Sequence, residues 1–265
     1  MSELNLLVVN VGNSRTQFGQ FVGTDLRRQM HLDNTAVPPL VQQAVQWWEQ
    51  TDEPKSLLMA SVNGEVAEPL DAALRDQLSV EIYHVGEDVP VPIGRCLDPE
   101  TIIGVDRLLN AVAAWDRIHQ ACIIVDTGTA ITVDFVDGDG TFHGGAIIPG
   151  AMMQLAALHA GTSNLPELQF IAPDDSDVFG RSTSQAMLKG VFHGIRGAVQ
   201  RLVEQYATQY GAFPQIVATG GDAETLFKGY ELIDDIVPEL AMLGIAAAAQ
   251  LALATENADR RDGRD

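Results

Sequence analysis

The sequence predicts an α/β protein, and two observations lead to this prediction. Short apolar runs rich in β-branched residues alternate with longer segments of helical periodicity, which is typical of a sheet covered by helices. Each half of the chain also begins with an apolar strand, a glycine-containing turn and a second strand, at residues 4–22 and 121–135. The 265 residues, 46% of them hydrophobic and 20% charged, suffice for one large or two medium domains.

The first half of the chain alternates between strands and helices. An apolar strand at residues 4–9 leads into a turn at 10–15 and then into alternating residues as far as Val22. The pattern then predicts a helix at 38–50, a strand at 56–62, a helix at 67–78, a strand at 80–85 and a helix at 108–119. Prolines at positions 90, 92 and 99 interrupt it and predict a surface segment. We therefore expect an N-terminal domain at residues 1–117.

The second half repeats this alternation. It predicts strands at 122–125, 130–135 and 142–148, a helix at 151–160, an acidic loop at 161–180, a long helix at 182–210, a strand at 215–218 and a last helix at 238–254. We expect a C-terminal domain at residues 118–255. The polar tail at residues 256–265 is expected to be disordered.

The turn Asp126-Thr127-Gly128-Thr129 follows a buried apolar strand. Small residues in such a turn allow main-chain N–H groups to approach an anion closely. An aspartate at the end of a buried strand is costly unless a cation or hydrogen-bond donors meet it. The motif is therefore compatible with a phosphate and cation site, and equally with an ordinary hairpin in which Asp126 accepts bonds from the turn.

Three other short motifs are candidates for chemistry. The turn at 10–15 has the same layout as the one at 126–129, which is either an internal repeat or a chance similarity of two short glycine turns. Asp106 and Arg107 fall at the start of a helix, where the dipole favours a carboxylate and anions, although a capping aspartate with a solvated arginine would look the same. The strand–Gly220-Gly221–helix junction can hold a nucleotide or be a helix start capped by Asp222.

Composition excludes several classes of function. With 36 acidic and 16 basic residues the formal net charge is −20, which disfavours non-specific binding to nucleic acid or to anionic membranes. The two cysteines and six histidines have no disulfide or metal-ligand spacing, and no lysine lies in a P-loop. No signal peptide precedes the first strand, and the apolar run at 240–255 is too short to span a membrane comfortably, so we expect a cytoplasmic protein.

Taken together, these motifs resemble the type III pantothenate kinases, in the superfamily of acetate and sugar kinases, heat-shock chaperones and actin. The resemblance extends from residue 4 to about residue 254 and rests on the order and spacing of four motifs. It implies two ribonuclease-H-like domains with an interdomain cleft, assembled as a homodimer. It also implies transfer of the ATP γ-phosphate to the 4′-hydroxyl of pantothenate, the first step of coenzyme A biosynthesis.

The resemblance assigns roles to residues at the matching positions. Asp106 would be the general base, and Gly104, Val105, Arg107 and Thr183 would bind pantothenate. Asp126 would bind a monovalent cation, K⁺ or NH₄⁺, and Asn10 the magnesium of Mg²⁺-ATP. The nucleotide contacts would be Asn10, Val11, Gly12, Asn13, Ser14, Arg15, Thr16, Gln17, Gly128, Thr129, Gly220 and Gly221. Such roles fit phosphoryl transfer, which requires positioning and charge neutralisation more than covalent chemistry.

Two positions depart from the family pattern. The first motif usually begins with aspartate, whereas this chain has Asn10, which keeps a carbonyl oxygen but lacks the charge that favours a hard dication. Family members often have a tyrosine shortly before the second motif, whereas residues 95–99 contain no aromatic residue. These departures leave two alternatives open, a nucleotide-binding regulatory relative with weak or no activity and a kinase for another small hydroxy acid.

Overall fold

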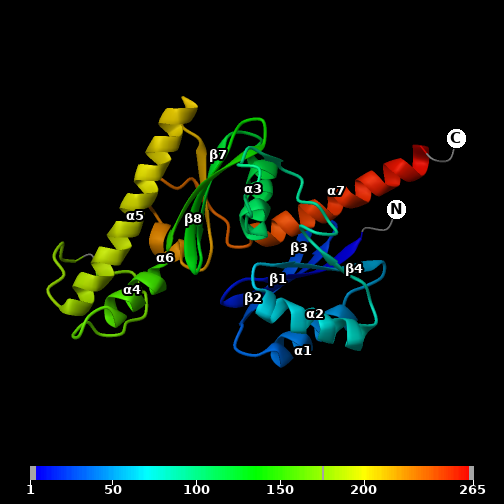
Figure 1. Cartoon of the computed structure of the whole chain (residues 1–265), viewed down its shortest axis with the longest axis horizontal. Coiled ribbons are helices and arrows are strands. Elements are labelled where there is room, and N and C mark those ends of the chain that lie inside the picture. Colours follow the sequence, from blue (N-terminus) through cyan, green and yellow to red (C-terminus); the bar gives the residue numbers. More distant parts are fainter. Residues whose placement is uncertain (1–3, 175, 263–265) are drawn as a thin grey trace. The chain divides into compact units, whose positions relative to one another are not determined.

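A computed structural model describes residues 4–174 and 176–262, and these residues form two compact units. The first unit contains residues up to 93, residues 99–113 and the last helix, and the second contains residues 94–98 and 114–239. Each unit has one mixed sheet with helices (Figure 1).

The sheet of the first unit has five strands in the order β3-β2-β1-β4-β5. Its strands are β1 (Asn5–Val11), β2 (Arg15–Val22), β3 (Asp25–Asp33), β4 (Lys55–Ser61) and β5 (Ile82–His84). β1, β2 and β3 form an antiparallel meander, whereas β4 and β5 extend the sheet in parallel with β1. The carboxyl ends of β1, β4 and β5 therefore lie at one edge of this sheet.

Helices cover both faces of the first sheet. Helices α1 (Val37–Glu49) and α2 (Gly64–Leu78) pack on one face and share an apolar core with β1, β2, β4 and β5 (Figure 1). The opposite face receives α7 (Leu240–Asp262), which contacts β1, β2 and β4. Because side chains alternate along a strand, Leu7 and Val9 face α1 and α2, whereas Leu6 and Val8 point the other way.

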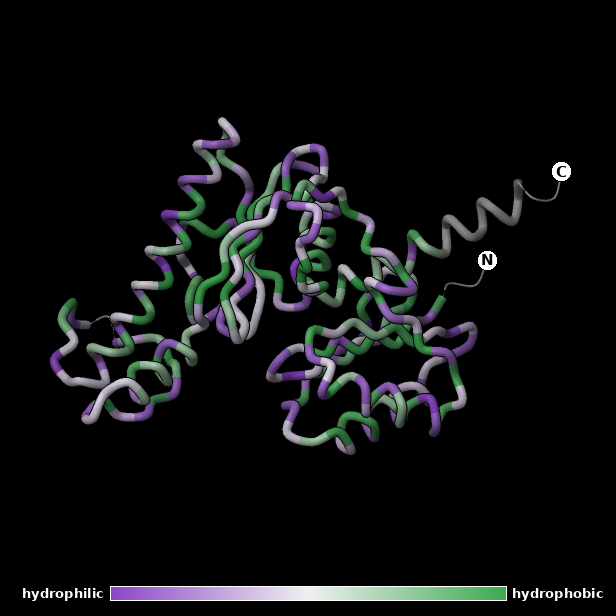
Figure 2. The backbone as a smooth tube through the Cα atoms, in the orientation of Figure 1, coloured by the Kyte–Doolittle hydropathy of each residue, from purple (hydrophilic) through white to green (hydrophobic). Residues whose placement is uncertain are grey.

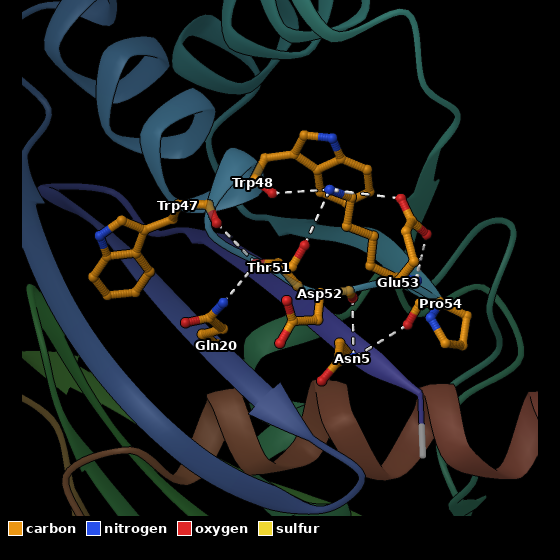
Figure 3. Close-up of polar contacts among 9 residues, drawn as sticks. Asn5, Gln20, Trp47, Trp48, Thr51, Asp52, Glu53 and Pro54 are labelled. Atoms are coloured by element: carbon orange, nitrogen blue, oxygen red, sulfur yellow. Dashed lines mark hydrogen bonds and ion pairs between the residues drawn. The ribbon is translucent and has the colours of Figure 1, made fainter. Parts of the chain in front are cut away.

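The end of α1 is tied to β2 and to the start of β4. The buried Thr51 hydroxyl donates to the Trp47 carbonyl at 2.8 Å and accepts from Gln20 Nε2 at 2.6 Å (Figure 3). The Lys55 ammonium donates to the carbonyls of Trp48 and Thr51, both at 3.1 Å, and lies 4.6 Å from the Trp48 ring centre. A lysine that satisfies the last carbonyls of a helix also complements the negative end of its dipole.

The sheet of the second unit has six strands in the order β11-β10-β7-β8-β9-β6. The strands are β6 (Gly94–Arg95), β7 (Cys122–Thr127), β8 (Ala130–Val136), β9 (Thr141–Pro149), β10 (Gln215–Thr219) and β11 (Asp235–Ile236). β7, β8 and β9 form an antiparallel meander, and β10 and β11 continue in parallel with β7. β7, β9 and β10 thus end at the same edge of this sheet.

Three helices share the main core of the second unit. They are α4 (Ala151–Ala160), α5 (Thr183–Tyr210) and α6 (Ala223–Phe227), and they pack against apolar residues of β7, β8 and β10 (Figure 2). α3 (Val105–Ile118) runs from the first unit into the second. Ala114, Arg117 and Ile118 at its end line a hollow of about 320 Å³ with Gln215, Val217, Asp234 and Asp235.

The predicted elements are largely present, but β3, β6 and β11 were not predicted and two expectations need correction. β6 and β11 have two residues each, and in β3 only Leu26, Met30 and Leu32 are apolar, so none of these strands gives an apolar run. The chain does not divide at 117/118, since α7 covers the open face of the first sheet and residues 94–95 pair with β9 of the second. The tail at 256–265, expected to be disordered, is helical as far as Asp262, and residues 263–265 lie outside the described residues.

Further findings concern the cysteines and the apolar helices. Cys122 is buried in β7, and burial raises the pKa of its thiol to about 12, in keeping with the expected role of a small apolar residue. Cys96 is exposed and unbridged. Among the described residues, no helix combines the length and apolar character that a membrane span needs.

A close helix contact gives a first prediction. A Cβ at Gly244 in α7 would lie 2.2 Å from the main-chain oxygen of Leu109 in α3, so the backbones would have to move apart. We expect Gly244→Ala to lower the free energy of unfolding by about 2 kcal/mol, as overpacking does, measured by urea denaturation.

Gly190 provides the matched control. It also lies inside a helix, α5, but a Cβ there would meet nothing within 4 Å. Gly190→Ala should stabilise the chain by about 0.5–1 kcal/mol, because alanine costs less entropy in a helix. Equal effects of the two substitutions would contradict the close packing of α7 on α3.

Candidate active site

The first predicted turn lies at the carboxyl edge of the first sheet and is held by two asparagines. The Gly12 N–H donates to the Arg15 carbonyl at 2.9 Å, which closes the turn between β1 and β2. Asn34 Nδ2 donates to the Gly12 carbonyl at 2.8 Å, and Asn63 Nδ2 donates to the Asn13 carbonyl at 3.1 Å. These bonds fix the carbonyls of the turn, while the side chains of Asn13, Ser14 and Arg15 remain exposed.

Asn10 lies opposite Gln17 in the β1–β2 ladder, and the two side chains meet. Asn10 Nδ2 donates to Gln17 Oε1 at 3.1 Å. Both residues are half-buried, whereas Val11 and Thr16 are buried, with the Thr16 hydroxyl donating to Asn34 Oδ1 at 2.7 Å. The pair is neutral, and the Asn10 carbonyl oxygen is not used in the bond to Gln17.

The motif Gly104-Val105-Asp106-Arg107 lies at the start of α3. Asp106 is in the first turn, where its Oδ1 accepts the Arg107 N–H at 2.8 Å, and it is half-buried. A side chain at position 104 would lie 3.7 Å from Val62, the residue that follows β4, so the motif is at the carboxyl edge of the first sheet. Asp106 therefore occupies the positive end of a helix dipole at the edge that also carries the turn after β1.

The turn at 126–129 occupies the corresponding edge of the second sheet. Asp126 is half-buried at the end of β7, and Thr127 beside it is 1% exposed. The Gly150 N–H, after β9, donates to the Thr129 carbonyl at 3.1 Å, and the Asp222 N–H, after β10, donates to the Thr127 carbonyl at 3.2 Å. The three turns that follow β7, β9 and β10 are thus joined directly by main-chain bonds.

Gly220 makes the closest approach in this group. Its φ is +92°, in the region that favours glycine, and a Cβ there would lie 2.5 Å from Asp126 Oδ1 and 2.6 Å from the main chain of Thr127. The glycine therefore allows the loop after β10 to lie against the Asp126 carboxylate. Asp222, considered a possible helix cap, makes no side-chain capping bond to the short helix α6.

Thr183 is the first residue of α5 and is exposed. Ser182 caps this helix, since its hydroxyl accepts the Gln185 N–H at 3.2 Å. In the segment before it, the Arg181 guanidinium and the Phe179 N–H lower the pKa of Asp177, and bonds from Ser176 lower the pKa of Asp174. The buried Lys189 donates to the Asp174 carbonyl, so Asp174 and Asp177 are held by hydrogen bonds near the start of α5.

The structure brings the predicted residues together in two groups, one in each unit. The first unit carries residues 10–17 with 104–107, and the second carries Asp126, Gly128 and Thr129 with Gly220 and Gly221. Sequence reasoning missed Asn34 and Asn63, which hold the first turn, and it gave Thr127 no role. Neither asparagine lies in a recognisable motif, and no local sequence signal indicates these contacts. Within the described ranges there is no group of three His, Cys, Asp or Glu side chains that could hold a metal.

The sequence of this chain is similar to a known protein family and to several of its members. The family model described as type III pantothenate kinase matches residues 6–205. The chain is a member of this family. A type III pantothenate kinase from Dehalococcoides mccartyi is 31% identical over 261 residues, covering 95% of this chain and 99% of the relative. One from Rhodopirellula baltica is 43% identical over 188 residues, covering 68% and 66%.

Solved structures similar to this type III pantothenate kinase family member confirm the fold. A Campylobacter jejuni protein assigned to the Baf family of transcriptional activators has a TM-score of 0.59 at 20% identity, covering 94% of this chain and 99% of that one. The activator of 2-hydroxyisocaproyl-CoA dehydratase from Clostridium difficile, with bound ADPNP, has a TM-score of 0.52 at 12% identity and 98% coverage of both chains. The predicted actin-like ATPase fold with ribonuclease-H-like units is therefore correct.

Proposed function

We propose that this chain phosphorylates pantothenate at the expense of ATP, with Asp106 as the general base. The observation that carries the proposal is the family match, which spans residues 6–205 and so includes the motifs at 10–17, 104–107 and 126–129. The product is 4′-phosphopantothenate, and the reaction is the first step of coenzyme A biosynthesis.

Asp106 is suited to its role by its position in the helix. The first turn of α3 favours the ionised carboxylate, whose Oδ1 accepts the Arg107 N–H. This carboxylate is proposed to accept the proton of the pantothenate hydroxyl as that hydroxyl attacks the γ-phosphorus of ATP. Gly104, Val105, Arg107 and Thr183 are proposed to bind pantothenate, with the guanidinium of Arg107 complementing its carboxylate.

The glycine turns are proposed to bind the nucleotide. In the first unit residues 10–17 provide main-chain N–H groups and short polar side chains, and in the second unit Gly128, Thr129, Gly220 and Gly221 provide open main chain. Main-chain donors of this kind bind phosphates without requiring basic residues. They suit a chain with a net charge of −20.

Magnesium fits this arrangement as a partner of the nucleotide. Mg²⁺ usually retains waters and binds substrate phosphates with one or two protein oxygens, so the lack of a cluster of three acidic or histidine ligands among the described residues is compatible with its use. The Asn10 carbonyl oxygen is proposed as such a ligand. When bound, the ion would neutralise charge on the phosphates.

A monovalent cation, K⁺ or NH₄⁺, is proposed at Asp126. This carboxylate is half-buried at the end of β7 and lies against the loop at Gly220. Carboxylate and carbonyl oxygens are the donors that hard cations prefer. The proposed cation site therefore rests on the preference of such cations for the Asp126 carboxylate oxygens.

The alternative of a regulatory relative without activity is not favoured. The chain retains Asp106 and Arg107 at the start of α3, and a protein that only binds nucleotide needs no general base. The likeness to a protein assigned to transcriptional activation is at 20% identity and supports the fold alone.

The central prediction combines the assay with loss of the base. Purified protein given ATP, Mg²⁺ and pantothenate should form 4′-phosphopantothenate, and more of it with potassium than with sodium. Asp106→Asn should lower kcat by about 10²–10⁴-fold, since the neutral amide cannot accept the proton, while ATP binding is retained.

Asp116 provides the control, because it is an exposed aspartate near the other end of the same helix. Asp116→Asn should leave kcat unchanged. Full turnover of Asp106→Asn would refute the base, and a wild-type protein that binds ATP but forms no product would refute the proposed function. Product formed only from another hydroxy acid would favour the alternative substrate class.

Asn10 gives a prediction about the metal. Asn10→Asp supplies a carboxylate, a better ligand for a hard dication, and the Gln17 amide can rotate to donate to it. We expect either a higher kcat or a lower magnesium concentration for half-maximal activity, measured by magnesium titration at fixed ATP. Asn164→Asp, which adds the same charge at an exposed position outside the candidate site, is the control, and an unchanged magnesium dependence of Asn10→Asp would remove Asn10 from the metal site.

A homodimer is proposed through α4. This helix carries Met152, Met153 and Leu158 with exposed fractions of 40%, 47% and 38%, and Ile147 just before it is 61% exposed. Only Ala151 and Leu155 of the helix are buried. A short helix that is apolar on its solvent side suits burial against an equivalent surface, and closed two-fold pairing is the commonest assembly of identical chains.

A single charge should separate such a dimer. Met153→Glu is expected to convert it to a monomer, measured by sedimentation equilibrium, because a carboxylate would be buried without a partner. Gln209→Glu adds the same charge at an exposed position of α5 and should have no effect. A wild-type protein that sediments as a monomer at all concentrations would rule out this interface.

A further inference from the structure

Thr127 is a buried polar residue at the end of β7. Its side chain is 1% exposed, and its Oγ1 donates to the Thr219 carbonyl at 2.9 Å. The two residues are 92 positions apart in the sequence. The bond therefore joins the turn after β7 to the turn after β10, both proposed above to take part in binding.

The bond lies where the β7–β10 ladder ends. The last parallel pair is Asp126 with Thr219, and beyond it the chain turns at Gly220. A second bond crosses at the same point, from the Asp222 N–H to the Thr127 carbonyl at 3.2 Å. Thr127 thus uses both its hydroxyl and its carbonyl to hold the 219–222 turn.

The side chains of Asp126 and Thr127 point to opposite faces of the sheet, because side chains alternate along a strand. The Thr127 hydroxyl is therefore in the protein interior while the Asp126 carboxylate is half-buried next to Gly220. A valine would fill the same space without the hydroxyl and would leave the Thr219 carbonyl without this donor. The shape of the strand end does not require threonine, but the bond to the Thr219 carbonyl requires a hydroxyl.

We propose that Thr127 is a positioning residue that fixes the 219–222 turn against Asp126 and so couples cation binding at Asp126 to nucleotide binding at Gly220 and Gly221. The inference rests on the proposed function for the identity of the ligands. Thr127 itself, being buried, does not contact them. A shift of the turn would change the distance between carboxylate and glycines, and each ligand would then bind to an altered site.

The test measures binding of a non-hydrolysable ATP analogue with Mg²⁺ to the full chain by calorimetry, in potassium chloride and in choline chloride. For the wild type we expect tighter binding in potassium. Thr127→Val should weaken binding about tenfold, the effect of one lost hydrogen bond at a site, and should bring the two dissociation constants together. Thr127→Ser, which keeps the hydroxyl, should restore both the affinity and the potassium effect.

Thr51 offers a matched control in the first unit. It is 4% exposed, and its hydroxyl likewise donates to a main-chain carbonyl, that of Trp47, at 2.8 Å (Figure 3). Thr51→Val should lower the unfolding temperature as Thr127→Val does but leave nucleotide affinity and the potassium effect unchanged. If Thr127→Val does not fold, Thr127→Ala is compared with Thr127→Ser in the same way.

The outcomes separate this inference from the proposed function. Unchanged affinity and potassium effect in Thr127→Val, or equal losses in Thr51→Val, would overturn the coupling role. A wild type with no potassium effect would also overturn it. A wild type that binds the analogue with the expected Thr127 dependence but does not phosphorylate pantothenate would refute the proposed function and leave the positioning role supported.

Discussion

The candidate site depends on the parallel pairing of β1 with β4 and of β7 with β10. Parallel strands end at a common edge, and the loops that follow them are brought together there whatever their distance in the sequence. In the first unit this pairing brings the turn after β1 to the residues after β4, where Asn63 bonds to the Asn13 carbonyl. In the second it brings residues 126–129 to 219–222. The motifs owe their proximity to this topology.

The strongly acidic composition determines how such an edge can bind a nucleotide. Both glycine turns offer main-chain N–H groups rather than lysines, and the polar residues around the first turn are mostly neutral amides. Asn10, Gln17, Asn34 and Asn63 position one another or the turn without adding charge. In a chain with a net charge of −20, neutral groups at the proposed phosphate site avoid the repulsion that further carboxylates would add.

Much of the fold follows from local pattern, and the exceptions have physical causes. The apolar strands and the helices at 151–160 and 183–210 are evident because burial imposes a period on their sequences. β3 is an edge strand in which only Leu26, Met30 and Leu32 are apolar and Arg28 interrupts their alternation, so its periodic signal is weak. The placement of α7 on the first sheet depends on the sheet face that α1 and α2 leave uncovered. The sequence of residues 240–262 alone therefore does not predict where this helix packs.

The same distinction applies to the site. Residues recognisable from sequence are those in short glycine motifs, because close main-chain approach requires particular residues at fixed spacing, as at Gly220. Residues that act through long-range hydrogen bonds, such as Thr127 and Asn34, can occur in any strand end or loop, and only the folded structure reveals their partners. Asn10 belongs to both classes. Its position in a motif marks it as a candidate site residue, whereas its bond to Gln17 explains how a neutral amide can be held in the place of a carboxylate. The opposite strand supplies an acceptor for its NH₂ group, and this bond leaves the carbonyl oxygen for other partners.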